Sequence, residues 1–155
     1  MSVELINAKT INEDENLLIT VSAQSELGYS MTFSAASDTA DVVASVDGES
    51  LTVSPADNWD GDALITVMVT DENSLSDTTS FTLTVSSVND APVIVAIPDT
   101  SMDEDHTMSI AILTSDVDGD YLYVWIPEWS ESEYLQTYVY DDGDSLMLVP
   151  DENWY

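Results

Sequence analysis

Three carboxylates lie on alternate residues in the stretch "DVDGD", at Asp116, Asp118 and Asp120. The chain contains one basic residue, Lys9, and no arginine, so it offers almost no positive charge to neutralise them. Alternate residues of an extended segment point to the same side, and Asp116 and Asp118 can therefore present two carboxylates together. Such a pair either stays a solvated acidic turn or binds a cation that prefers oxygen ligands.

An EF-hand loop fits this stretch poorly. That loop requires glycine at its sixth position, whereas Gly119 is at the fourth, and Pro127 stands where the bidentate glutamate is needed. No helical period flanks the stretch on either side. A solvated turn and a metal-binding loop of another kind therefore both stay open.

The charge of the chain excludes two classes of partner. With 31 acidic residues and a formal net charge of −30, the chain repels phosphate backbones and anionic bilayers. We therefore expect no nucleic-acid partner, and no insertion into a membrane because no apolar run reaches roughly 18 residues. At 44% hydrophobic residues the chain is nonetheless expected to fold.

Catalytic chemistry has little support in the sequence. His106 is the single histidine and has no plausible nucleophile beside it, and there is no cysteine and no arginine to stabilise an oxyanion. Acidic residues are so frequent that a pair of them does not indicate a glycosidase. We therefore expect that the protein is not an enzyme.

The local pattern predicts β-strands throughout. Short runs alternate apolar and polar residues and are bounded by Gly, Pro, Asn or Asp, as half-buried strands require. Asp47-Gly48 and Asp142-Gly143 are typical of two-residue hairpin turns. Many short strands favour sandwiches of two antiparallel sheets. The clearest runs are 17–23, 31–35, 51–55, 64–71 and 81–88.

The sequence repeats itself. Residues 11–21 match 102–112 with an offset of 91 residues, and 47–59 match 142–154 with an offset of 95. A period of this length corresponds to one whole sandwich per repeat, so each repeat is expected to have its own core.

The second repeat is expected to lack its last strands. By the offset of 95, Tyr155 is the counterpart of Asp60, whereas the first repeat continues with "ALITVMVT" and "FTLTVSSV". Apolar residues such as Leu146 and Leu148 would then stay uncovered, beside unpaired strand edges. Two explanations are open: the chain is part of a longer parent, which we favour, or a neighbouring subunit or another polypeptide donates the strands.

Two stretches resemble a known family, the cadherin-like tandem repeats of large secreted bacterial surface proteins and adhesins. "VSSVNDAPV" at 85–93 is similar to the cadherin linker D-x-N-D-N-A-P, and "TSDVDGDYLYV" at 114–124 is similar to the D-x-D-x-G loop and its following strand. "INEDEN" at 11–16 and the spacing of Asp57 and Asp71 are weaker matches. The resemblance covers nearly the whole chain.

The resemblance implies an all-β fold of two tandem cadherin- or immunoglobulin-like antiparallel β-sandwiches, repeat 1 at 1–90 and an incomplete repeat 2 at 91–155. It also implies Ca²⁺ bound between consecutive repeats. Ser87, Ala91 and Trp59 stand where the family has ligands; an alanine carbonyl can still coordinate, whereas the losses at Ser87 and Trp59 imply fewer or weaker ions. The implied ligands are Glu13 or Asp14, Asp57, Asn89, Asp90, Asp116 and Asp118.

The function that follows is that of an extracellular module on a bacterial cell surface, in which Ca²⁺ stiffens a stalk or filament of repeats. Its partners would be other repeats of the parent or neighbouring subunits. The alternative is a tip domain that binds a carbohydrate or a protein ligand through aromatic residues, of which Trp125, Trp129 and Tyr134 are candidates. Aromatic residues also favour sheets, so packing remains open as their role.

Overall fold

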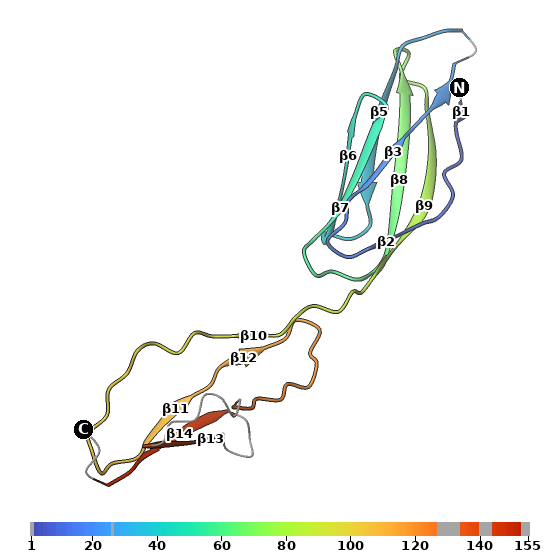
Figure 1. Cartoon of the computed structure of the whole chain (residues 1–155). Coiled ribbons are helices and arrows are strands. Elements are labelled where there is room, and N and C mark those ends of the chain that lie inside the picture. The colour runs from blue at the N-terminus through green and yellow to red at the C-terminus, as the bar shows by residue number, and fades with distance from the viewer. Residues whose placement is uncertain (1, 26, 127–133, 140–143, 153–155) are drawn as a thin grey trace. The chain divides into compact units, whose positions relative to one another are not determined.

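Every regular element in the described part of the chain is a β-strand. The computed structural model describes residues 2–25, 27–126, 134–139 and 144–152. The chain divides into two units, Met1–Val88 (unit 1) and Asn89–Tyr155 (unit 2) (Figure 1). Within the described ranges, no helix is long and apolar enough to cross a membrane. The predicted all-β fold is thus confirmed.

Unit 1 contains two main sheets, whose strands lie face to face in Figure 1. All pairings are antiparallel except that between β2 and β9, which is parallel. A further pair joins β1 (Ser2–Val3) and β4 (Ala23–Gln24). The four-stranded sheet has the order β2 (Lys9–Asn12), β9 (Ser76–Ser86), β8 (Gly61–Asp71) and β5 (Met31–Ser37). The three-stranded sheet has the order β3 (Leu17–Thr20), β7 (Ser50–Pro55) and β6 (Val42–Asp47).

The core of unit 1 lies between these sheets and depends chiefly on β8 and β9. Side chains alternate across a strand, and most of the inward positions of these two strands are apolar. Leu51 and Val53 of β7 face them from the other sheet and are fully buried. The buried side chains of β8 and β9 are Ala63, Ile65, Val67, Val69, Phe81, Leu83 and Val85.

The hairpin between β6 and β7 is shifted by one residue from the sequence prediction. Asp47 pairs with Ser50, so the two loop residues are Gly48 and Glu49. Gly48 has φ +60°, a backbone conformation that costs glycine little. The corresponding pair Asp142-Gly143 lies outside the described residues.

Unit 2 has two small antiparallel sheets in its described residues. One pairs β10 (Val93–Ile94) with β12 (Thr114–Ser115). The other has the order β11 (Met108–Ala111), β14 (Ser145–Pro150) and β13 (Leu135–Val139).

The strand pairing reproduces the sequence repeat. Leu17 pairs with Val53 in unit 1, and their counterparts Met108 and Leu148 pair in unit 2. The first pair of strands follows the same rule: Ser2 faces Gln24, and Val93 faces Ser115. Even the positive φ of Asp14, 61°, recurs at its counterpart Asp105, 58°. The sheet of β11, β14 and β13 is therefore the counterpart of β3, β7 and β6.

The four-stranded sheet of unit 1 has no counterpart among the described residues of unit 2. This agrees with the prediction that the second sandwich lacks its last strands. The solvent exposure of the remaining strands reflects the lack of this sheet. Leu146 and Leu148 are partly exposed, whereas their counterparts Leu51 and Val53 are fully buried. Ile112 is the one buried apolar side chain that the described part of unit 2 contains.

Candidate metal site

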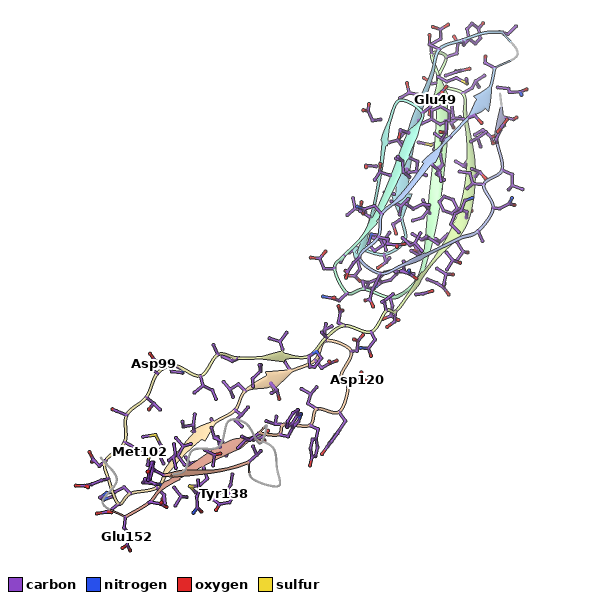
Figure 2. All side chains as sticks on the ribbon, in the orientation of Figure 1. Glu49, Asp99, Met102, Asp120, Tyr138 and Glu152 are labelled. Atoms are coloured by element: carbon purple, nitrogen blue, oxygen red, sulfur yellow. The ribbon has the colours of Figure 1, made fainter. Side chains whose placement is uncertain are left out.

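The acidic loop of unit 2 is organised by one carboxylate. Asp116 Oδ1 accepts hydrogen bonds from the backbone N–H groups of Asp118, at 3.0 Å, and Asp120, at 3.2 Å. Gly119, with φ +75°, lets the backbone turn back so that its N–H lies 3.4 Å from the Asp116 carbonyl oxygen. Asp120 is exposed on this loop, where Figure 2 labels it. Asp116 therefore shapes the loop, and one of its carboxylate oxygens is occupied by that role.

Asp118 reaches the start of unit 2. Its Oδ2 accepts a hydrogen bond of 2.6 Å from the backbone N–H of Asp90. Carboxylate oxygens of Asp90 and Asp118 lie within 4.8 Å of one another. Asn89 is exposed beside them, and its Nδ2 donates to the Asp90 carbonyl oxygen at 2.8 Å. Two residues that the chain separates by 28 positions thus bring their carboxylates together.

Glu13 is the one buried acid among the candidates, at 6% exposure. Its backbone N–H donates to the Ser86 carbonyl oxygen at 2.9 Å, at the end of β9. Its side-chain Oε1 accepts from the backbone N–H of Val88, the last residue of unit 1. Removing a carboxylate from water is costly unless it is hydrogen-bonded or paired with a cation, and the chain has a single lysine and no arginine.

Asp14 and Asp57 lie elsewhere in unit 1. Asp14 has φ 61°, and its Oδ1 accepts a hydrogen bond of 2.9 Å from the backbone N–H of Asn58. Asp57 is exposed and makes no hydrogen bond to the other candidates within the described residues. The structure thus separates the two acids that the sequence left as alternatives: Glu13 faces Val88, whereas Asp14 faces the loop at Asn58.

Two backbone amides organise the candidate carboxylates, and sequence reasoning missed both. These are the N–H groups of Val88 and Asp90, which donate to Glu13 and Asp118. A backbone donor leaves no signal in residue type, so only the linker position of both residues could have suggested them.

Two other acids of unit 1 have structural roles of their own. Asp71 is buried, and its Oδ1 accepts from the backbone N–H groups of Asn73 and Leu75, which closes the turn between β8 and β9. Asp77 Oδ2 accepts from Val3 N–H at 2.9 Å and so holds β1.

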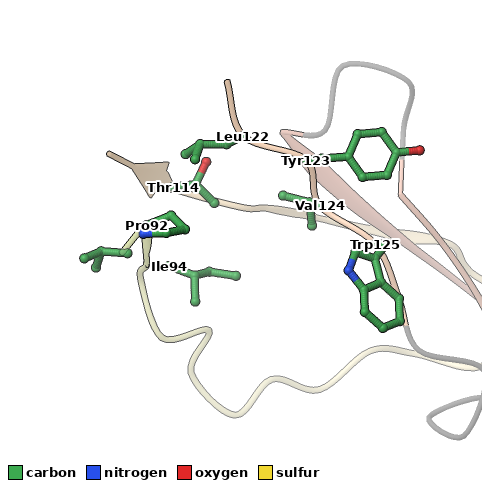
Figure 3. A pocket seen from close by; sticks show the side chains of 8 residues that line it. Pro92, Ile94, Thr114, Leu122, Tyr123, Val124 and Trp125 are labelled. Carbon is green, nitrogen blue, oxygen red and sulfur yellow. The ribbon is translucent and has the colours of Figure 1, made fainter. Parts of the chain in front are cut away.

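An aromatic row occupies the segment after the acidic loop. Tyr121, Tyr123 and Trp125 are 92%, 81% and 68% exposed. The candidate Tyr134 is half exposed, and the candidate Trp129 lies outside the described residues. Beside the row is a hollow of about 260 Å³, in which Figure 3 shows Val124 directed inward and Tyr123 pointing away. The hollow is lined by Pro92, Val93, Ile94, Thr114, Leu122, Tyr123, Val124 and Trp125.

No protein-family model matches the chain, and no curated protein matches it. One similar solved structure is SGBP-B of the Bacteroides ovatus mixed-linkage glucan utilization locus, in complex with a mixed-linkage heptasaccharide. It is 12% identical over 96% of this chain and 36% of that one, with a TM-score of 0.41. Extracellular cadherin domains 1–5 of protocadherin gamma B2 match at 16% identity over 97% of this chain and 31% of that one, with a TM-score of 0.40.

A third similar structure is the N-terminal Ig1-2 module of the Drosophila receptor protein tyrosine phosphatase DLAR. It is 11% identical over 98% of this chain and 85% of that one, with a TM-score of 0.34. The chain spans about a third of the length of the first two structures. At these scores, the likeness does not bear on what this chain binds.

Proposed function

We propose that the chain is a calcium-binding extracellular module, in which Ca²⁺ binds at the linker between the two units. The observation that carries the proposal is the approach of the Asp90 and Asp118 carboxylates to within 4.8 Å in unit 2. Two like charges about 4 Å apart repel by roughly 1 kcal/mol even in water. A chain with 31 acids and one base supplies almost nothing to offset this repulsion, which favours the binding of a cation.

Unit 1 adds Glu13 to this pair through chain connectivity. The Glu13 carboxylate is hydrogen-bonded to Val88 N–H, and that of Asp118 to Asp90 N–H. Val88 and Asp90 are two residues apart, a separation of at most about 7 Å along the backbone. The two carboxylates are therefore tethered to backbone amides two residues apart, and we propose that Glu13 joins the Asp90–Asp118 pair when Ca²⁺ binds.

The donor set suits Ca²⁺ rather than a transition metal. All candidate ligands are oxygen atoms, the chain has no cysteine, and Ca²⁺ accepts 6–8 oxygens in flexible geometry. Carboxylates of Glu13, Asp90 and Asp118, with the side-chain oxygen of Asn89 and water, would supply the shell. Extracellular modules typically bind Ca²⁺ with Kd of about 10⁻⁴–10⁻³ M. Ser87 and Trp59, which stand where the resembled family has acidic ligands, favour an affinity in this range.

The role of the ion would be to restrict the angle between the units, as in a surface stalk built from repeats on a bacterial cell. This proposal assigns no catalytic role to the chain. Without Ca²⁺, the carboxylates on the two sides of the linker repel, and the linker is free to bend. Extracellular Ca²⁺ is abundant enough for a site of modest affinity to be filled.

Small-angle X-ray scattering tests this role. We expect the distribution of interatomic distances to narrow when Ca²⁺ is added to chelator-treated chain, because one ion holds residues from both units. Sodium chloride at the same ionic strength is the control for general screening of the charges. An unchanged distribution with Ca²⁺ would contradict the stiffening role.

Carbohydrate binding is the second candidate, and the exposure of Tyr121, Tyr123 and Trp125 favours it. Flat aromatic faces stack on sugar rings, and alternate residues of an extended segment present their rings on one side. We expect that a binding oligosaccharide would shift the fluorescence of the native chain and that Trp125→Ala would abolish the shift. Tyr138→Ala, at another exposed aromatic residue, is the matched control. A panel of neutral oligosaccharides without any effect would reject this function.

A further inference from the structure

Residues 122–126 of unit 2 have the burial pattern of a strand but pair with no other strand among the described residues. The offset of 91 makes them the counterpart of residues 31–35 in β5. In both segments burial alternates with a period of two: Leu122, Val124 and Ile126 are partly buried, and the residues between them are exposed. In unit 1, β5 lies at the edge of its sheet and pairs with β8 alone. Residues 122–126 therefore correspond to β5 of unit 1, and the described residues of unit 2 contain no strand that corresponds to β8.

The segment at the other edge of this sheet also lacks the strand that it would pair with. Residues 100–103 are the counterpart of β2, which pairs only with β9, and they form no strand. Just before them, Ile97 is 40% exposed, whereas its counterpart Ile6 packs against the core of unit 1. Both edge segments of the four-stranded sheet are thus present in unit 2, and its two central strands are not among the described residues.

The inner side of residues 122–126 is an apolar hollow. Val124 lines it with Ile94 and Thr114, as Figure 3 shows. In unit 1 the counterpart of Val124 is Phe33, which packs against the core cluster that β8 and β9 complete. Unit 1 therefore shows which kind of element covers this face: an antiparallel hairpin with apolar residues on alternate positions.

We propose that unit 2 binds a β-hairpin with the pattern of β8–β9, supplied by a polypeptide segment other than residues 1–155. The hairpin would pair antiparallel with residues 122–126 and parallel with residues 100–103, and its inward side chains would fill the hollow. Pairing along an open strand edge supplies backbone hydrogen bonds, and alternate side-chain pockets supply specificity. The proposal concerns the open face of unit 2 and does not depend on calcium.

A second copy of this chain is a poor occupant. Its own β8 and β9 pair with each other and with β5 and β2, and they carry most of the buried side chains of unit 1. Donating them would empty one core in order to fill another, with no net gain in buried area.

Unit 1 also predicts the register. Thr32 faces Thr70 and Phe33 faces Val69 in the pairing of β5 with β8. In a complex with a peptide of residues 61–86, Tyr123 should therefore face Thr70 of the peptide. Cα atoms of facing antiparallel residues are about 4.5–5.5 Å apart, which is inside the range that a disulfide spans.

The first experiment adds the synthetic 61–86 peptide to the whole chain and follows hydrogen exchange. At a peptide concentration a hundred times Kd, exchange of residues 108–111 and 145–150 should slow about a hundredfold, because the peptide stabilises folded unit 2. A peptide of the same composition with its alternation scrambled should have no effect. Val124→Asp should weaken binding, whereas Tyr121→Asp, at a 92% exposed residue that does not line the hollow, should not.

The second experiment tests the register with disulfides, which the cysteine-free chain makes unambiguous. The chain with Tyr123→Cys should form a disulfide with the peptide that carries Thr70→Cys and not with the peptide that carries Thr66→Cys. The cysteine of the second peptide lies on the same face of the strand, four residues away. Equal cross-linking of both peptides, or no change in exchange at saturating peptide, would overturn the proposal. A chain that sediments as a dimer with these strands already protected would also overturn it, in favour of a second copy.

Discussion

Calcium is expected to raise the melting temperature of the native chain by roughly 10–20 °C over the chelated state, for domains of 60–100 residues. An ion that binds only the folded state adds RT ln(1 + [Ca²⁺]/Kd), or about 2.7 kcal/mol at a hundredfold excess over Kd. This stabilisation arises because the carboxylates of Asp90 and Asp118 repel each other without the ion, whereas both are attracted to bound Ca²⁺. Differential scanning calorimetry in Ca²⁺ and in EDTA measures the shift.

General screening of a chain with net charge −30 also raises stability, and it must be separated from binding. Sodium chloride at matched ionic strength gives the contribution of screening alone. Binding predicts a clear excess of the Ca²⁺ shift over the sodium shift and a rise that saturates with Ca²⁺ concentration. Equal shifts of the melting temperature with both salts would mean that Ca²⁺ only screens the acidic residues and binds at no defined site.

The Asp118→Asn variant should lose at least about tenfold in Ca²⁺ affinity, a change of roughly 1.4 kcal/mol. Asparagine keeps the side-chain oxygen that accepts the Asp90 N–H, so the loop should retain its conformation while one charged ligand is lost. The matched control is Asp120→Asn, two residues further along the same loop. Asp120 is exposed, and its backbone N–H, which the substitution preserves, is what holds it to Asp116.

Both variants change the net charge by the same amount and at nearly the same place, so any effect of the overall field is common to them. Their difference in affinity therefore reports ligation by Asp118. Similar affinities for the two variants would reject Asp118 as a ligand, and an unchanged melting temperature in EDTA would show that the loop had stayed folded.

Most of the fold follows from two features of the sequence. The alternation of apolar residues predicted the strands, because strand side chains alternate between core and solvent. The offsets of 91 and 95 anticipate even the pairing of Met108 with Leu148 from that of Leu17 with Val53. Residues 122–126 show the limit: they carry a strand pattern and form no strand, because a strand requires a hydrogen-bonding partner that local sequence does not reveal.

The site was less predictable than the fold. Glu13 and Asp14 are neighbours in "NEDEN", but their side chains bind different backbone amides, and Asp14 adopts a positive φ. Their residue types alone did not show that Glu13 would be the one that contacts Val88. Asp57 was selected on its spacing from Asp71, yet it is exposed and makes no hydrogen bond to Glu13 or Asp14 within the described residues, while Asp71 closes the turn between β8 and β9. Spacing along the chain does not determine which loops meet when strands cross between sheets.

The central claim, that these carboxylates form a defined calcium site, is tested most directly by isothermal titration calorimetry of the metal-free native chain with CaCl₂ at physiological ionic strength. We expect a saturable isotherm with Kd of about 10⁻⁴–10⁻³ M or tighter. This isotherm should persist when the sodium chloride concentration is doubled, and the affinity should be weaker in the Asp118→Asn variant. Heats that never saturate, that vanish with added salt and that are the same for the native chain and the variant would contradict a defined calcium site.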